Sequence, residues 1–279
     1  MIAASLALGQ TLRERGAHDE AITILAQTVE HLAATGSVPM DQAAALSELA
    51  KAHYAAGHYD DSASIYRDVL QRHRAIVGNA HPLVAGDIAS LAAIEQDLGY
   101  YDKAEMLARE ALAINERYYG VESPHTADNL TSLGRALLYQ LAVQESAVGS
   151  SHPLVAEAVN ELGNILAMQD RFAEAAANFQ RSADIYRNVH GDRHYFVAIA
   201  LSNVAYMQMK QGDYDKAEAL FRPESLAGYE ILAAQASPSI SFLRAARDDL
   251  VLIYEATGQT EKAAGFRQEI AALDNDATH

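Results

Sequence analysis

The chain has no cysteine among its 279 residues, and this absence removes several kinds of chemistry. It excludes a disulfide framework, a zinc–thiolate site and a thiol nucleophile. No apolar run approaches the ~18 residues that a membrane-spanning helix needs. Proline is scarce, with six residues, and the 16 glycines are few for this length. Alanine, in contrast, is abundant, which favours helices and lets them approach one another closely.

Positive charge is also scarce, since 21 Lys and Arg stand against 37 Asp and Glu, and the formal net charge is −16. A strongly acidic chain repels phosphate backbones and anionic lipids, so we expect no nucleic-acid partner and no membrane partner. The first residues lack the basic leader of a signal peptide. We therefore expect a cytoplasmic protein, although a segment of a larger protein would look the same.

One pattern recurs along the whole chain: a Leu or Val followed, in most cases, by a small residue. The pairs begin at Leu8, Leu49, Leu91, Leu133, Leu162, Val204 and Leu250. Eight residues after the first member comes a glycine in most repeats, for example Gly57, and Asp170 in one. An aromatic such as Tyr59 follows in four repeats, and a small residue such as Ser62 comes three positions later.

Each part of this pattern has a role in a pair of helices. The Leu-small pair lies on the inner stripe of a first helix, where the small side chain lets its partner come close. Glycine ends that helix in the left-handed conformation, which other residues adopt only at a cost. The aromatic fills the space near the turn, and the small residue after it marks where the second helix crosses the first.

The connectors between these pairs repeat as well. Gly78-Asn-Ala-His-Pro82, Gly120-Val-Glu-Ser-Pro124 and Gly149-Ser-Ser-His-Pro153 share one spacing, and Gly191-Asp-Arg-His-Tyr195 keeps it without the proline. Glycine closes one helix and proline opens the next, where its missing N–H costs nothing. The period from Pro82 to Pro124 is 42 residues. The sequence therefore predicts an all-α solenoid, an α-α superhelix of about six to seven antiparallel helix pairs.

These motifs resemble a known group. The segments Gly78 to Ala85, Gly149 to Ala156, Gly99 to Glu105 and Ala111 to Ile114 look like the 42-residue tetratricopeptide repeats of kinesin light chains and their bacterial relatives. The segment Ala246 to Gly258 is similar to the end of the tetratricopeptide tails on bacterial serine/threonine kinases. The resemblance implies a solenoid that holds other polypeptides, and it covers nearly the whole chain.

The fourth repeat is short, because Pro124 to Pro153 spans 29 residues instead of 42. Either the chain has lost most of that second helix, or a segment is missing from the record between Gln140 and Leu141. A real loss predicts one long helix over residues 125–148. We accordingly expect two arrays: residues 1–140, with three repeats and the first helix of the fourth, and residues 141–279, with repeats five to seven and a capping helix.

In the sixth repeat Pro223 falls where a helix interior is expected. Proline removes a hydrogen bond and clashes with the preceding turn, at a cost of ~3 kcal/mol. The sequence predicts a kink or break there.

No catalytic motif is present: there is no phosphate loop, no nucleophile elbow and no His-Glu-x-x-His. His81, His152 and His194 occupy one connector position, and we interpret them as residues that cap or pack the turn and not as metal ligands. His190 and His194 are expected on different faces, because Gly191 lies between them. We thus predict no enzymatic activity, no cofactor and no metal.

The first helices are the better candidates for function, because in a tetratricopeptide superhelix they line the concave face. Positions two before, two after and five after the conserved Leu are predicted to point into the groove. The residues that we select there are Lys51, Tyr54, Arg135, Asn160, Asn164 and Tyr206. Asparagine can grip a peptide backbone, tyrosine stacks, and lysine or arginine pairs with an acidic group.

The leading hypothesis is a protein-interaction module that binds a peptide segment of a partner protein in this groove. One alternative is a structural scaffold that self-associates as a homo-oligomer through exposed solenoid ends. Another is the non-catalytic regulatory tail of a larger signalling protein.

Overall fold

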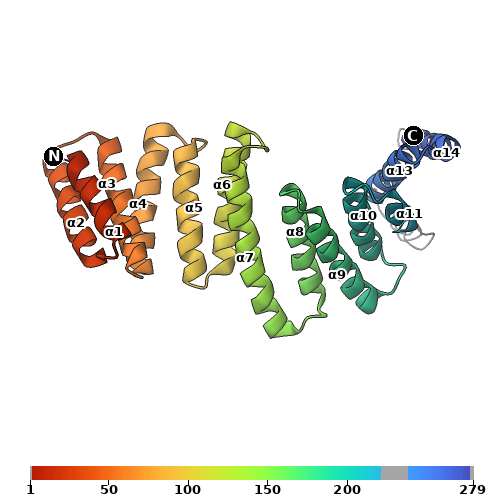
Figure 1. The fold of residues 1–279 in the computed structure, drawn as a ribbon, viewed down its shortest axis with the longest axis horizontal. Helices are drawn as coiled ribbons and strands as arrows, with labels where there is room; N and C mark the ends of the chain where they lie inside the picture. The colour runs from red at the N-terminus through yellow and green to blue at the C-terminus, as the bar shows by residue number, and fades with distance from the viewer. Residues whose placement is uncertain (1, 221–237, 277–279) are drawn as a thin grey trace. The chain divides into compact units, whose positions relative to one another are not determined.

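The computed structural model describes residues 2–220 and 238–276, and helices joined by short turns make up these ranges. Its contacts divide the chain into two units, Met1–Ala136 and Leu137–His279, which are described separately here (Figure 1). The predicted limits of the two arrays, 1–140 and 141–279, remain a prediction. Pro223 lies outside the described residues, so the predicted kink is not addressed.

The first unit is built from consecutive helix pairs. Its helices are α1 Ile2–Glu14 with α2 His18–Ala34, α3 Pro39–Ala55 with α4 Tyr59–Val77, α5 Pro82–Asp97 with α6 Tyr101–Tyr119, and the beginning of α7 Pro124–Val148. Each helix packs against its partner, and α2 and α4 also pack against the first helix of the next pair. This is the predicted all-α architecture of stacked antiparallel pairs.

The second unit continues in the same manner. It contains the rest of α7, then α8 Pro153–Met168 with α9 Phe172–His190, α10 Tyr195–Lys210 with α11 Tyr214–Leu220, and α13 Pro238–Ala256 with α14 Thr260–Asp276. The described residues thus form six pairs and the single helix α7. The long helix predicted for a shortened fourth repeat is present, because α7 runs unbroken for 25 residues.

The repeated residues hold each pair together as predicted. The small residue of the second helix is fully or almost fully buried in every described pair: Ala21, Ser62, Ala104, Ala175, Ala217 and Ala263. Ser62 also donates a hydrogen bond from its hydroxyl to the Ala50 carbonyl at 2.8 Å. The repeated Leu or Val of the first helices is buried in the other repeats, but 48% of Leu8 is exposed on α1, which packs against α2 and α3.

The turns within pairs have the predicted left-handed residue. Gly57 has φ +79°, and Asp170 takes the same region with φ +58°, the only described non-glycine residue to do so. Asp and Asn tolerate this region better than other side chains. Gly78 in a connector has φ 81° and ψ 168°, a combination that is essentially confined to glycine.

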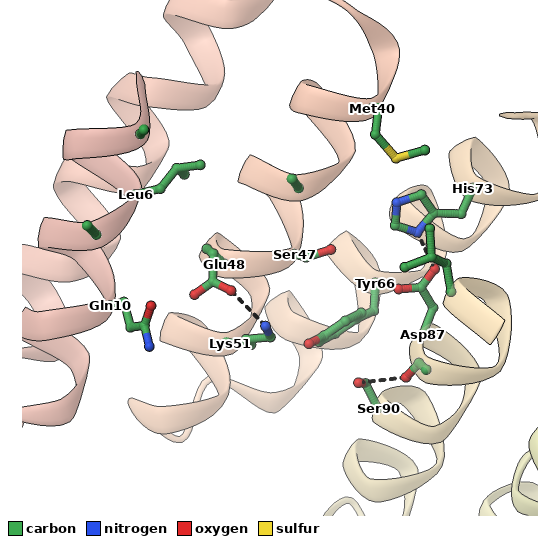
Figure 2. Close-up of a pocket in the computed structure, with 15 residues that line it drawn as sticks. Leu6, Gln10, Met40, Ser47, Glu48, Lys51, Tyr66, His73, Asp87 and Ser90 are labelled. Atoms are coloured by element: carbon green, nitrogen blue, oxygen red, sulfur yellow. Dashed lines mark hydrogen bonds and ion pairs between the residues drawn. The ribbon is translucent and has the colours of Figure 1, made fainter. Parts of the chain in front are cut away.

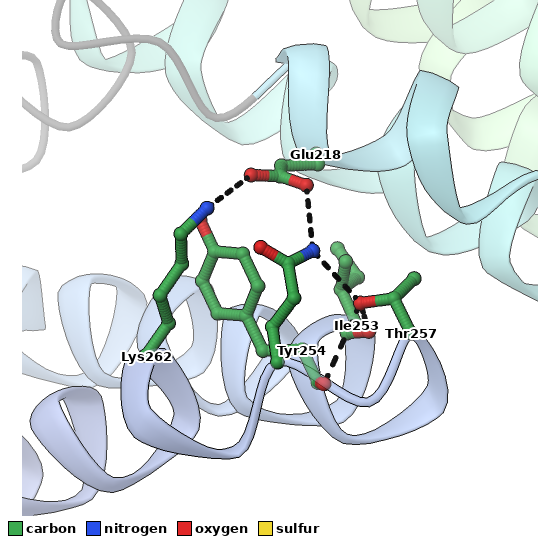
Figure 3. A network of polar contacts seen from close by, with 6 residues as sticks. Glu218, Ile253, Tyr254, Thr257 and Lys262 are labelled. Atoms are coloured by element: carbon green, nitrogen blue, oxygen red, sulfur yellow. Dashed lines mark hydrogen bonds and ion pairs between the residues drawn. The ribbon is translucent and has the colours of Figure 1, made fainter.

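At the end of the second unit, a polar network joins α11 to the α13–α14 pair (Figure 3). Glu218 accepts hydrogen bonds from Lys262 at 3.3 Å and from Gln259 at 3.4 Å. Burial and the neighbouring Glu218 raise the pKa of Tyr254 to about 12. No helix in the described ranges is long and apolar enough to cross a bilayer.

Candidate peptide-binding groove

A groove of about 750 Å³ opens on the first unit, along the first helices of three consecutive repeats. Figure 2 shows side chains of α1 on one side, those of α5 on the other, and Glu48 and Lys51 of α3 between them. The lining residues are Ala3, Leu6, Ala7, Gln10, Met40, Ala44, Ser47, Glu48, Lys51, Tyr66, His73, Leu83, Gly86, Asp87 and Ser90. Its volume lies within the range of ligand sites in proteins.

Small residues at one repeated position open this groove. Ala3, Ala44 and Gly86 each lie five residues before the conserved Leu of their helix. Ala7 and Ser90 are small residues one helical turn further on, so α1 and α5 each present a strip with little side-chain volume, whereas α3 has Glu48 at this position. A Cβ added at Gly86 would meet nothing within 4 Å. The backbone of α5 is therefore directly accessible from the groove.

The centre of the groove is polar and charged. Lys51 Nζ donates to Glu48 Oε1 at 2.7 Å. The other carboxylate oxygen, Glu48 Oε2, is buried and forms an ion pair with Arg13 Nη2 at 3.8 Å, but it accepts no hydrogen bond from the described residues. A buried carboxylate oxygen without a hydrogen bond is costly. Glu48 Oε2 is thus an acceptor that an incoming N–H group would satisfy.

A second polar pair forms one wall. His73 Nδ1 of α4 lies 2.6 Å from Asp87 Oδ2 of α5, and both side chains are buried. Burial raises the pKa of Asp87, and the hydrogen bond with His73 opposes this shift. The equivalent positions of the next repeat, 42 residues later, hold Asn115 and Asn129, which are also hydrogen bonded. The fold therefore places a polar pair here in two successive repeats.

The predicted residues of the first unit lie in different places. Lys51 lines the groove. Tyr54 lies one turn further along α3 and donates to Asp97 Oδ2 of α5 at 2.5 Å. The hydrogen bond to Asp97 and burial raise the pKa of Tyr54 to about 12, and the nearby charge of Arg135 opposes the shift. The structure thus brings Tyr54, Asp97 and Arg135 together, beyond the residues that line the groove.

The other predicted residues belong to the second unit. Asn160 and Asn164 are half-buried on α8, and Asn164 donates to Glu161 Oε2 at 3.1 Å. Tyr206 is exposed on α10, with Lys210 Nζ 5.3 Å from its ring centroid. These residues remain a predicted binding surface of their own.

Comparison with known proteins now identifies the repeat. A family model described as tetratricopeptide repeat matches residues 86–149 and 154–230, and a second model of the same description matches residues 42–83. The chain belongs to the tetratricopeptide repeat family. Tetratricopeptide repeats are typically non-catalytic modules for protein interaction, and they bind protein or peptide partners. No match was found among the curated proteins.

Several solved tetratricopeptide structures are similar to this chain. One is described as a kinesin light chain of Podosopora anserina, at 17% identity and a TM-score of 0.46, covering 84% of this chain and 97% of that one. Another is BtubC (BKLC) from P. vanneervenii, at 18% identity and a TM-score of 0.42, covering 100% of this chain and 92% of that one. A third is the complex of the TPR2AB domain of yeast Sti1 with pHSP90. It has 17% identity and a TM-score of 0.42, and the match covers 100% of this chain and 99% of that one.

In this tetratricopeptide array the connector histidines cap helices, as interpreted from the sequence. The Nδ1 atoms of His81, His152 and His194 accept hydrogen bonds from the backbone N–H two residues later, at 3.2–3.3 Å. His190 ends α9 and His194 precedes α10, so they share no helix face, as expected, but their rings still stack with centroids 4.2 Å apart. The turn at Gly191 reverses the chain and brings the two rings face to face.

Several groove residues were not selected from the sequence. Leu6 and Gln10 of α1 lie two before and two after the conserved Leu8 but were not among the selected residues, and His73 comes from a second helix. In α5 the lining residues are Leu83, Gly86, Asp87 and Ser90, whose i, i+3, i+4, i+7 spacing places them on one helix face. The small residue five positions before each conserved Leu is the sequence signal that marks this site.

Proposed function

We propose that the groove of the first unit binds an extended peptide segment of a partner protein. The observation that carries this proposal is a groove lined by three successive first helices whose central carboxylate, Glu48, has a buried oxygen without a hydrogen bond. A peptide N–H or a basic side chain would supply the missing donor. The small residues along the strip leave room for the peptide backbone.

The charges of the chain indicate the kind of peptide. Glu48 and Asp87 face the groove, and Lys51 is already paired with Glu48. The chain as a whole carries −16, which attracts cationic segments and raises their association rate. We propose a peptide with a basic side chain for Glu48 and small or apolar side chains against Leu6, Met40 and Leu83.

The second unit offers a further proposed contact for a longer partner. Asn160 and Asn164 can donate and accept at a peptide backbone, and the exposed ring of Tyr206 can stack on it. The supporting observation is that these polar side chains lie on first helices of their pairs, α8 and α10. This surface is a separate proposal from the groove.

A peptide array probed with the purified chain tests the proposed function. We expect bound spots enriched in Lys and Arg, and weaker binding for Glu48→Gln, which removes the charge that a basic side chain would meet. Lys51→Glu should also change the bound set, whereas Arg135→Glu, outside the groove, should change it less. An array on which none of these variants alters the bound peptides would contradict the placement of the site.

One observation favours the alternative of a self-associating scaffold. Leu8 is a conserved repeat position that stays 48% exposed on the first helix of its unit, and exposed apolar ends of solenoids promote association. Light scattering over a range of concentrations should then show a mass above 30.1 kDa that returns to this value in Leu8→Gln. A constant mass of one chain would exclude the scaffold. A regulatory tail and a cytoplasmic location also remain proposals.

A further inference from the structure

Three potential metal ligands come together at the turn of the second helix pair, away from the groove. His53 belongs to the last turn of α3, His58 precedes α4, and Asp61 lies in the first turn of α4. One ligand atom from each of them lies within 4.8 Å of the others. His53 Nδ1 is 3.7 Å from Asp61 Oδ2, and the two imidazole rings have centroids 5.7 Å apart.

The backbone of the turn fixes this arrangement. His58 N–H donates to the His53 carbonyl at 2.9 Å, and Gly57 between them has φ +79°. This bond is that of a Schellman turn, which places the side chains of its two ends side by side. Glu95 and Lys103 occupy the positions of His53 and Asp61 in the next repeat, and Lys103 Nζ pairs with Glu95 Oε2 at 3.9 Å. The repeat geometry therefore brings these positions together whatever residues occupy them.

The state of His53 suits a metal ligand. Its Nδ1 is buried and has no hydrogen bond to the described residues, and its side chain is only 17% exposed. A buried imidazole nitrogen without a hydrogen bond can coordinate a metal ion.

We propose that His53, His58 and Asp61 bind a divalent transition-metal ion such as Zn²⁺, with solvent in the fourth position. Bonds of about 2.0–2.2 Å in a tetrahedral site place ligand atoms about 3.3–3.6 Å apart. The separation between His53 and Asp61 already approaches this range. Both His58 and Asp61 are exposed, so their side chains can rotate to close the remaining distance.

The direct test is a calorimetric titration of the chelator-treated protein with Zn²⁺ alone, without any peptide. We expect one bound ion and a thermal midpoint that rises with Zn²⁺ concentration, because the ion links α3 to α4. Substituting Co²⁺ should give the intense visible absorption of a tetrahedral site. His53→Gln and His58→Gln should each weaken binding at least about tenfold.

The variants are chosen so that folding is retained. Gln208 and Gln259 occupy the positions of His53 and His58 in other repeats of this chain. His31→Gln, an exposed histidine of α2, is the control and should leave binding unchanged. The proposal is overturned if the wild-type chain binds no Zn²⁺, or if both glutamine variants bind it as tightly as the wild type. Failure of peptide binding would leave this result unaffected, because the ligands lie outside the groove.

Discussion

Gly163 of α8 packs directly on the ring of Phe179 of α9. A Cβ at position 163 would lie 2.7 Å from Phe179 Cε1, and the ring cannot move aside because it is 2% exposed within the core of its unit. Gly9 of α1 packs in the same way on the buried side chain of Leu25, because a Cβ at position 9 would lie 2.6 Å from Leu25 Cδ2. The small member of the repeated Leu-small pair is thus required by the close approach of two helices.

Replacing Gly163 with Ala should destabilise the protein, although alanine is the better helix former. We expect a net loss of about 1–2 kcal/mol, because the added methyl group overpacks a filled core. The same change at Gly86, where nothing lies within 4 Å, should instead raise stability by about 0.5–1 kcal/mol. Urea denaturation of both variants checks this, and equal midpoints would contradict the packing account.

A serine should replace a capping histidine with little loss of stability. At His152 an alanine removes the acceptor for the Leu154 N–H and should cost about 1 kcal/mol. A serine should be nearly neutral, because Ser123 already caps α7 at the equivalent position, accepting from the His125 N–H at 3.3 Å. Thermal melts of His152→Ala and His152→Ser distinguish the two. Equal losses would show that the ring acts through packing alone.

The ionisation of Asp249 should lower the free energy of unfolding of the second unit as pH rises. Burial raises the pKa of Asp249 to about 6, a shift only partly opposed by a 3.5 Å hydrogen bond from Ser202. The folded pKa lies above the unfolded value of about 3.9, so the protonated form favours folding. Its contribution is complete below pH 4 and is lost as pH rises through 6.

The substitution Asp249→Asn should therefore stabilise the protein by about 1–2 kcal/mol at pH 8, allowing for partial exposure of the carboxyl group, and have little effect at pH 4. Urea midpoints at the two pH values measure this difference. Asp248→Asn should give a smaller gain of the same sign at pH 8, because the charge of Asp248 also raises the pKa of Asp249. A gain for Asp249→Asn that is the same at both pH values would rule out ionisation as the cause.

Most of the fold could be predicted from the sequence because one local code is repeated. The buried small residues and the left-handed turns follow from residue spacing within a single repeat, whereas the long helix α7 was one of two outcomes that the short fourth repeat allowed. The exposure of Leu8 does not follow from the repeat pattern, because burial of this position depends on which helices pack around α1. The stacking of His190 on His194 was missed because a turn, and not a helix face, brings them together.

The candidate site was harder to predict than the fold. Lys51 could be placed in the groove because it lies on the accessible face of a first helix. Tyr66 and His73 could not, since they reach the groove from a second helix. Asp87 was missed because its partner, His73, lies 14 residues earlier in another repeat. Contacts between repeats depend on how the helices stack, which residue spacing within one repeat does not specify.

The most direct test of the account is to fill the groove without disturbing the fold. Gly86→Leu places a side chain in the open strip, and Gly265→Leu makes the same change on α14 of the second unit, where the added Cβ also meets nothing within 4 Å. The affinity of an array-selected peptide for both variants should be measured by calorimetry. The account predicts a loss of about tenfold or more for Gly86→Leu alone, and equal affinities for the two variants and the wild type would contradict it.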